Sequence, residues 1–157
     1  MYTQRKNLLD VYCVHGARLG IFREAFDRVL ELEGFQLTPV VNTPEVWEFR
    51  NPALSLHGRL LNVAGFLHPD PVALNTKGRA YLITRQDFTL ALLFQGAPWH
   101  LQLNRTRHKA MAVEGRLPYP ERWPGELVTR VIRARFRTIV ILDEAYLLQQ
   151  IGLRGPQ

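Results

Sequence analysis

The sequence has very little cysteine and serine. Cys13 is the only cysteine among 157 residues, and Ser55 is the only serine. A single cysteine excludes an intrachain disulfide and a metal site built from several cysteines. Ser55 stands between two leucines, without the Gly-x-Ser-x-Gly turn that presents a nucleophilic serine. Disulfides and cysteine-based metal sites are therefore excluded, and the common motif of a nucleophilic serine is absent.

Long hydrophobic runs are also missing. The segments 139–142 and 90–94 are apolar, but a membrane-spanning helix needs about 20 such residues. Asp10 interrupts the apolar residues near the start, so this region does not resemble a secretory signal. We expect a cytoplasmic protein without a membrane partner.

Motifs for metals and cofactors are absent from the sequence as well. No glycine-rich phosphate-binding loop occurs, and the histidines show no zinc-ligand spacing. The five histidines are His15, His57, His68, His100 and His108. We therefore assign no catalytic residue, no metal site and no cofactor.

The composition is that of an ordinary globular protein, with 46% hydrophobic and 22% charged residues. A chain of this length is long enough to bury a substantial core and suits one domain. We expect residues 1–152 to form a single globular domain and residues 153–157 to form a short C-terminal tail.

Hydrophobic spacing predicts the elements of the first half. Residues 8–14 are rich in β-forming side chains and predict a strand. Apolar residues then recur at intervals of three and four, which predicts an amphipathic helix over residues 17–33 that ends at Gly34. Further strands are expected at 46–50, 54–60, 79–84 and 88–95.

The second half is expected to contain a hairpin and helical elements. A strand from Trp99 continued past residue 104 would place three cations on its apolar face, so we expect a turn near 104–107. Residues 127–132 fit a helix, 138–142 a buried strand, and Asp143 the N-cap of a last helix ending at Gly152. The predicted class is α+β: a mainly antiparallel sheet with an amphipathic helix near the N-terminus and helical elements near the C-terminus.

The positive charge is confined to one half of the sequence. Residues 1–78 contain eight Lys or Arg and eight Asp or Glu, whereas residues 79–157 contain twelve and six, so the second half carries the net charge of +6. Seventeen of the 20 basic residues are arginine. Such an uneven distribution favours an anionic partner.

Two clusters hold much of this charge. One comprises Arg130, Arg133, Arg135 and Arg137, with no carboxylate between Glu126 and Asp143. The other is the tip of the expected hairpin, with Arg105, Arg107, His108 and Lys109. Because like charges at this density repel, we expect acidic groups or a bound anion to neutralise them.

The charge pattern leads to a functional prediction. We predict a non-enzymatic nucleic-acid-binding protein that contacts phosphates of DNA or RNA through both clusters. Trp123, between Arg122 and Pro124, is the candidate for stacking on a base. The alternative is a protein-interaction subunit or inhibitor whose basic face docks onto an acidic protein partner. A third possibility is that the basic face is solvated and forms ion pairs with acids of the first half. It would then need neither a nucleic acid nor a protein partner.

A small nuclease is a second alternative. Asp87 and Glu114 could hold a metal ion, with Arg116 stabilising the charge that develops on phosphate. A metal-free ribonuclease would use His100 or His108 with the arginine cluster. Neither arrangement has a motif that sets it apart.

Overall fold

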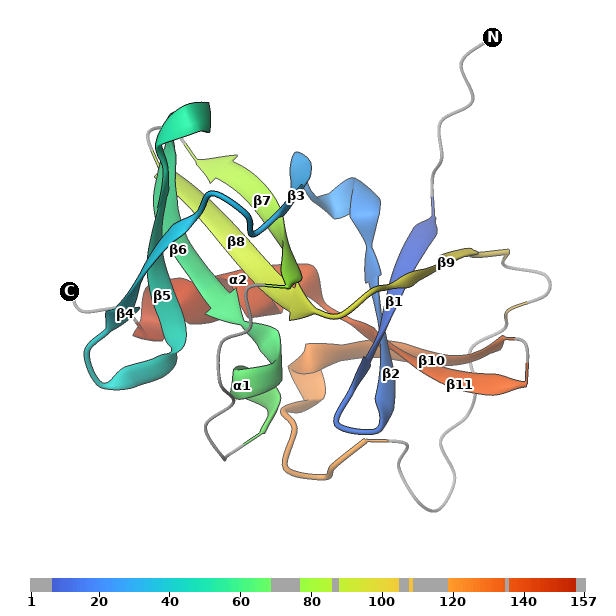
Figure 1. The fold of residues 1–157 in the computed structure, drawn as a ribbon. Coiled ribbons are helices and arrows are strands. Elements are labelled where there is room, and N and C mark those ends of the chain that lie inside the picture. Colours follow the sequence, from blue (N-terminus) through green and yellow to red (C-terminus); the bar gives the residue numbers. More distant parts are fainter. Residues whose placement is uncertain are drawn as a thin grey trace, which may run out of the picture. The chain divides into compact units, whose positions relative to one another are not determined.

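A computed structural model describes residues 7–68, 77–85, 88–104, 108, 119–134 and 136–154. The chain divides into two compact units, and each unit is formed by two separate segments of the chain. Unit 1 contains Met1–Ala25 and Ala97–Glu144, and unit 2 contains Phe26–Gly96 and Ala145–Gln157. Each unit is built mainly from β-strands (Figure 1). That residues 1–152 form one domain stays a prediction.

Unit 1 contains one mixed sheet. Within the described ranges its strand order is β10-β11-β2-β1-β9. Neighbouring strands are antiparallel except β11 and β2, which are parallel. The strands are β1 (Leu8–Val14), β2 (Ala17–Phe22), β9 (Trp99–Gln102), β10 (Val128–Ala134) and β11 (Arg137–Leu142), with short 3₁₀ turns η1 (Arg23–Ala25) and η3 (Gly125–Leu127).

The predicted helix over 17–33 is wrong. Val14 pairs with Ala17, and the two residues between them, His15 and Gly16, have φ angles of 49° and 81°. Positive φ at both positions gives a tight turn whose twist matches antiparallel strands, so the chain returns as β2. Residues 23–25 then form η1, and residues 28–31 form a strand of unit 2. The three-and-four spacing arises by chance across these separate elements.

The predicted helix over 127–132 is also wrong, because these residues end η3 and form most of β10. Val131 and Ile132 are both buried although they point to opposite faces of the strand. A strand buried on both faces shows no alternation of apolar and polar residues, and this pattern can resemble a helix.

One face of the unit 1 sheet forms an apolar core. Phe22 and Trp99 pack at the margin of this core. Its buried members are Leu9, Val11, Leu101, Leu103, Ile132, Ala134, Ile139 and Ile141. These residues come from four of the strands and from Leu103, whose backbone N–H donates to the carbonyl of Asn7. The core therefore holds the β10–β11 hairpin against β1.

Unit 2 contains a second mixed sheet and most of the helical residues. Among the described residues the strand order is β3-β7-β8-β6-β5-β4, and the β6–β8 pair is parallel whereas the others are antiparallel. Its elements are β3 (Arg28–Glu31), β4 (Gln36–Val40), β5 (Thr43–Asn51), η2 (Pro52–Leu54), β6 (Leu56–Asn62), α1 (Val63–Leu67), β7 (Gly78–Arg85), β8 (Phe88–Gln95) and α2 (Glu144–Arg154), which begins at the last residue of unit 1.

One apolar cluster of unit 2 lies on one face of its sheet, where Phe35 and Phe49 contact each other with ring centroids 5.4 Å apart. Its buried members are Leu32, Phe49, Leu60, Ala80, Leu82, Ala91 and Leu93. Gly58 allows β6 and β8 to approach closely, since a Cβ atom there would lie 1.7 Å from the carbonyl oxygen of Thr89. This position therefore excludes any side chain.

The fold class is corrected from α+β to a β-rich fold with two mixed sheets. The strands predicted at 8–14, 46–50, 79–84, 88–95 and 138–142 are confirmed, and so is a last helix after Asp143, which extends to Arg154. In the described part of the chain, neither helix is long and apolar enough to cross a membrane.

Candidate interaction surfaces

The β10–β11 hairpin presents an aromatic and two cationic side chains at its end. Ala134 pairs with Arg137, so only two residues separate the strands, which run side by side to their turn (Figure 1). Phe136 in this turn is 93% exposed, and Arg133 and Arg137 are exposed as well. We call Arg133, Phe136 and Arg137 the hairpin tip. It unites two residues of the predicted arginine cluster with an aromatic residue, whereas the sequence prediction chose Trp123 as the aromatic contact.

Phe136 has an uncommon backbone conformation. Its φ of 62° lies in the left-handed region, which bulky residues rarely occupy. Contact of Cβ with the following carbonyl oxygen costs roughly 1–2 kcal/mol in this conformation. A phenylalanine that is strained and almost wholly in solvent contributes little to folding.

Arg130 lies apart from the hairpin tip. It is half-buried, and its guanidinium carbon lies 6.0 Å from the centroid of the Phe22 ring. This is a cation–π distance, and Phe22 packs at the margin of the unit 1 core. Arg130 is thus partly a structural residue, and the predicted cluster does not form one continuous row.

The sequence left open whether acids within the fold neutralise the cluster. Among the described residues, no ion pair joins Arg130, Arg133 or Arg137 to a carboxylate. Arg135 lies outside the described residues, as do Arg105, Arg107 and Lys109 of the expected second hairpin. The role of these four residues stays a prediction.

Trp123 is buried, with 7% of its surface exposed, and its ring stacks on Tyr119 with centroids 5.7 Å apart. The backbone N–H of Trp123 donates to the carbonyl of Pro120 within a turn. In this structure the indole packs inside unit 1 instead of offering a face to a base.

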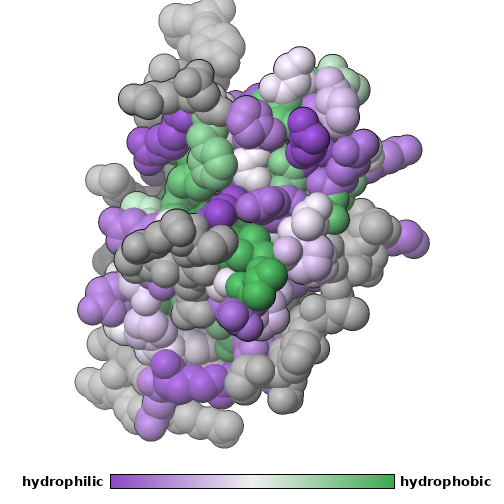
Figure 2. All heavy atoms as spheres, turned by 90° about the vertical axis from the view of Figure 1, so that its left-hand side faces the viewer, coloured by the Kyte–Doolittle hydropathy of each residue, from purple (hydrophilic) through white to green (hydrophobic). Residues whose placement is uncertain are grey.

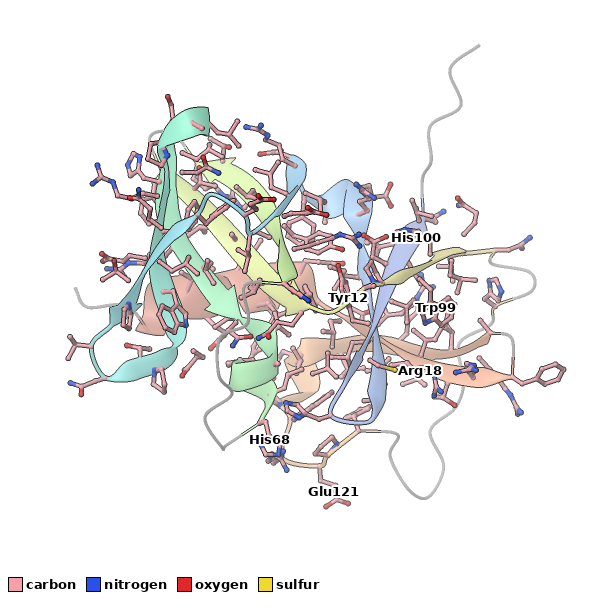
Figure 3. All side chains as sticks on the ribbon, viewed as in Figure 1. Tyr12, Arg18, His68, Trp99, His100 and Glu121 are labelled. Atoms are coloured by element: carbon pink, nitrogen blue, oxygen red, sulfur yellow. The ribbon has the colours of Figure 1, made fainter. Side chains whose placement is uncertain are left out.

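The histidines considered for catalysis have local partners. His100 Nδ1 lies 2.7 Å from Oδ1 of Asp10, its cross-strand neighbour, which is only 1% exposed. Figure 3 shows His100 and Trp99 on β9 and Tyr12 on the neighbouring β1. His108 Nδ1 accepts from the backbone N–H of Asn104.

The three residues considered for a metal-dependent nuclease, Asp87, Glu114 and Arg116, lie outside the described residues. Within the described ranges, no group of three or more histidine, cysteine, aspartate or glutamate residues could hold a metal ion.

Glu144 is the described acid whose titration the fold alters most clearly. Burial raises the pKa of its carboxyl group, and the charges of Asp143 and Glu24 act in the same direction. The backbone N–H of Phe22, which donates to Oε1 at 2.6 Å, opposes this shift. Glu144 therefore joins the end of β2 to the start of α2.

Unit 2 has a hollow of about 690 Å³ on the sheet face opposite the cluster that contains Leu60 and Leu93. It is lined by Glu48, Phe49, Arg50, His57, Gly58, Arg59 and Phe88, and we call it the unit 2 groove. Figure 2 views unit 2 from the side of β4 and β5, where hydrophilic and hydrophobic residues are interspersed. The sequence prediction missed this groove because its residues come together only through the pairing of β5, β6 and β8.

Comparisons with known proteins give a likeness of fold. No protein-family model matches the chain, and no curated protein matches its sequence. The chain is similar in structure to the scaffolding protein CheW from Thermoanaerobacter tengcongensis, with a TM-score of 0.62 and 9% sequence identity. The similarity covers 90% of this chain and 92% of the other, so both units take part in it.

The prediction of a nucleic-acid-binding protein is corrected. The fold resembles that of a scaffolding protein, and Trp123 is buried where stacking on a base would need it exposed. The positive charge on which the prediction rested is real, but it does not by itself select a polynucleotide.

Proposed function

We propose that this chain is a protein-interaction subunit that docks its hairpin tip onto an acidic patch of a partner protein. The observation that carries the proposal is Phe136, 93% exposed between the exposed arginines Arg133 and Arg137. Aromatic residues and arginine are the types that most often dominate the binding energy of protein interfaces. The hairpin tip places both types within five residues.

The energetics favour burial of this tip by a partner. Removing a phenylalanine side chain from water contributes about 1.5–3 kcal/mol, and little of that gain is realised in the free protein, since the side chain lies in solvent. Each guanidinium group can form two parallel hydrogen bonds with one carboxylate. Arg133 and Arg137 are without ion pairs among the described residues, so a docking carboxylate need not displace one there.

Charge and fold both support a protein with acidic side chains as the partner. The second half of the sequence, which contains the hairpin tip, carries the whole net charge of +6. The structural neighbour is described as a scaffolding protein, which supports a role in contacts between proteins. Complementary charge would speed the encounter and make it sensitive to salt.

The test is site-specific photocrosslinking followed by titration. A photoreactive amino acid replaces Phe136 in the full chain, or Val41, which is also exposed in a hairpin turn but belongs to unit 2. Crosslinking in host cells is expected to join an acidic protein to position 136 and not to position 41. That protein, once purified and treated with nuclease, should bind the wild type and bind Phe136→Asn much more weakly. Crosslinks to nucleic acid alone, or equal binding of the two forms, would contradict the proposal.

A further inference from the structure

The unit 2 groove combines side chains that strand pairing brings to one face. Glu48 pairs with Arg59 and Arg50 pairs with His57 across β5 and β6, so these four side chains share a face. On β8, Phe88 pairs with Arg85 of β7 and lies beside His57. The core residues Phe49, Leu60 and Ala91 point to the opposite face. The groove thus lies at one end of this face, since other side chains of the same face, Val46, Leu61 and Leu92, are buried.

An exposed aromatic pair forms the apolar part of the groove. Phe88 is 38% exposed, and its ring meets the His57 ring edge to face, with centroids 6.4 Å apart and an interplanar angle of 83°. The close approach of β6 and β8 at Gly58 fixes this spacing. An apolar side chain of a ligand could therefore pack against a ring that is already held in place.

The charges of the groove are unbalanced. Arg50 and Arg59 line it and Arg85 is the cross-strand neighbour of Phe88, whereas Glu48 is the acid that lines it. The Glu48–Arg59 ion pair is long, at 3.5 Å, and the glutamate side chain is 55% exposed, so solvent weakens it. Arg50 and Arg85 have no ion pair within the described ranges. The groove therefore carries an excess of positive charge beside its aromatic pair.

We propose that the unit 2 groove binds a short acidic peptide segment that carries one apolar or aromatic anchor side chain. Carboxylates of the segment pair with Arg50, Arg59 and Arg85, and the anchor packs on Phe88 and His57. The volume of about 690 Å³ lies within the usual range for ligand sites. The inference rests on the proposed function in taking the ligand to be part of a protein, but its site is separate from the hairpin tip.

The experiment measures fluorescence anisotropy of labelled peptides with the full chain at about 50 mM salt, where charge pairs are weakly screened. One peptide has the sequence Glu-Asp-Glu-Phe-Glu-Asp, and a second has alanine in place of phenylalanine. We expect the first to bind at least about tenfold more tightly than the second. Phe88→Ala and Arg50→Ala should each weaken its binding by a similar factor.

Two control variants separate this proposal from other outcomes. Arg28→Ala removes an exposed arginine of β3, away from the groove, and should leave binding unchanged. Phe136→Asn disables the hairpin tip and should leave it unchanged too. Loss of binding in Phe136→Asn would assign the peptide to the hairpin tip and overturn the groove, whereas failure of the crosslinking at position 136 would leave the groove result intact.

Amide resonances locate the peptide independently of any variant. Shifts on titration should concentrate in β5, β6 and β8, at residues such as Arg50, Gly58 and Thr89. Equal affinity for the alanine peptide, equal binding by Phe88→Ala and wild type, or equal displacement by a single-stranded oligonucleotide of the same charge would each overturn the proposal. Shifts confined to unit 1 would do so as well.

Discussion

Two hairpin turns of this chain share a left-handed second residue but differ in the side chain at that position. In unit 2 the turn between β4 and β5 contains Val41 and Asn42, and in unit 1 the turn between β10 and β11 contains Phe136. Asn42 and Phe136 both have φ of 62°. Asparagine is enriched in this conformation, whereas a bulky aromatic is an outlier. Asn42 thus suits the backbone of its turn, whereas Phe136 does not suit the backbone of its own and is better explained by contact with a partner.

The largest expected effect is on binding. Phe136→Asn gives the unit 1 turn the chemistry of the unit 2 turn and removes the aromatic anchor. We expect the affinity for the acidic partner to fall about thirtyfold or more, in the range of an interface hot spot, measured by isothermal titration. Val41→Ala, at the other turn, is the control and should bind like the wild type.

Charge at the hairpin tip should control the rate of association. Reversal of both arginines, Arg133→Glu with Arg137→Glu, is expected to slow association at least about tenfold at low salt, because an acidic partner would then be repelled. Stopped-flow measurement at two salt concentrations checks this, since the association rate of the variant should no longer fall as salt is raised. Arg28→Glu in unit 2 is the matched control. An unchanged association rate in the double variant would remove electrostatic steering from the proposal.

The reverse exchange tests the strain at the turns. Asn42→Phe should lower the free energy of unfolding by roughly 1–2 kcal/mol, because phenylalanine then occupies a left-handed position in unit 2. Urea denaturation measures the change. Val41→Phe puts the same ring in the same turn at a residue without positive φ, and should cost less. If both variants lose the same stability, exposure of the ring and not the backbone is the cause.

Relief of strain at the original site is expected to be smaller. Phe136→Asn should raise the free energy of unfolding by about 1 kcal/mol, since asparagine tolerates this φ and the lost ring is 93% exposed. The same urea denaturation applies. A large loss of stability would show that Phe136 has a structural role after all.

The stabilities of the turn variants have to be compared at one pH, because the protonation of Glu144 changes the free energy of unfolding. Its pKa is raised in the folded protein by burial, so the folded state binds more protons than the unfolded state above the ordinary value of 4.5. The stability that this group contributes is complete below that pH and is lost as pH rises through the raised pKa. Glu144→Gln keeps an oxygen acceptor for the Phe22 N–H and should lessen this dependence. Unfolding in urea at several pH values tests it, with exposed Glu126→Gln as the control; equal pH dependence of wild type and Glu144→Gln would contradict it.

The sequence predicts this fold unevenly, for physical reasons. The strand at 88–95 could be predicted because its β-forming apolar residues are contiguous, and the helix after Asp143 because a capping residue precedes it. A helix was wrongly predicted over 17–33 because the preceding His-Gly turn is not one of the common hairpin sequences, although both of its residues have positive φ. The predicted helix also crossed the boundary between the units after Ala25, where hydrophobic spacing has no single element to describe.

The candidate sites were predictable only in part. The arginines at 133 and 137 drew attention through their local density, and the structure places both at one hairpin end. The sequence prediction chose Trp123 as the exposed aromatic, and the exposure of Phe136 depends on a hairpin turn that the predicted arrangement did not contain. The unit 2 groove depends on the pairing of strands far apart in sequence, such as β6 with β8, which local pattern cannot supply.

The most direct test pairs two measurements on wild type and Phe136→Asn. Calorimetric titration with the purified acidic partner gives the affinity, and urea denaturation of the same samples gives the stability. If Phe136 is a docking residue, the variant binds far more weakly than the wild type but is at least as stable. A variant that keeps its affinity, or one that loses stability together with binding, would contradict the assignment of this side chain to interaction instead of folding.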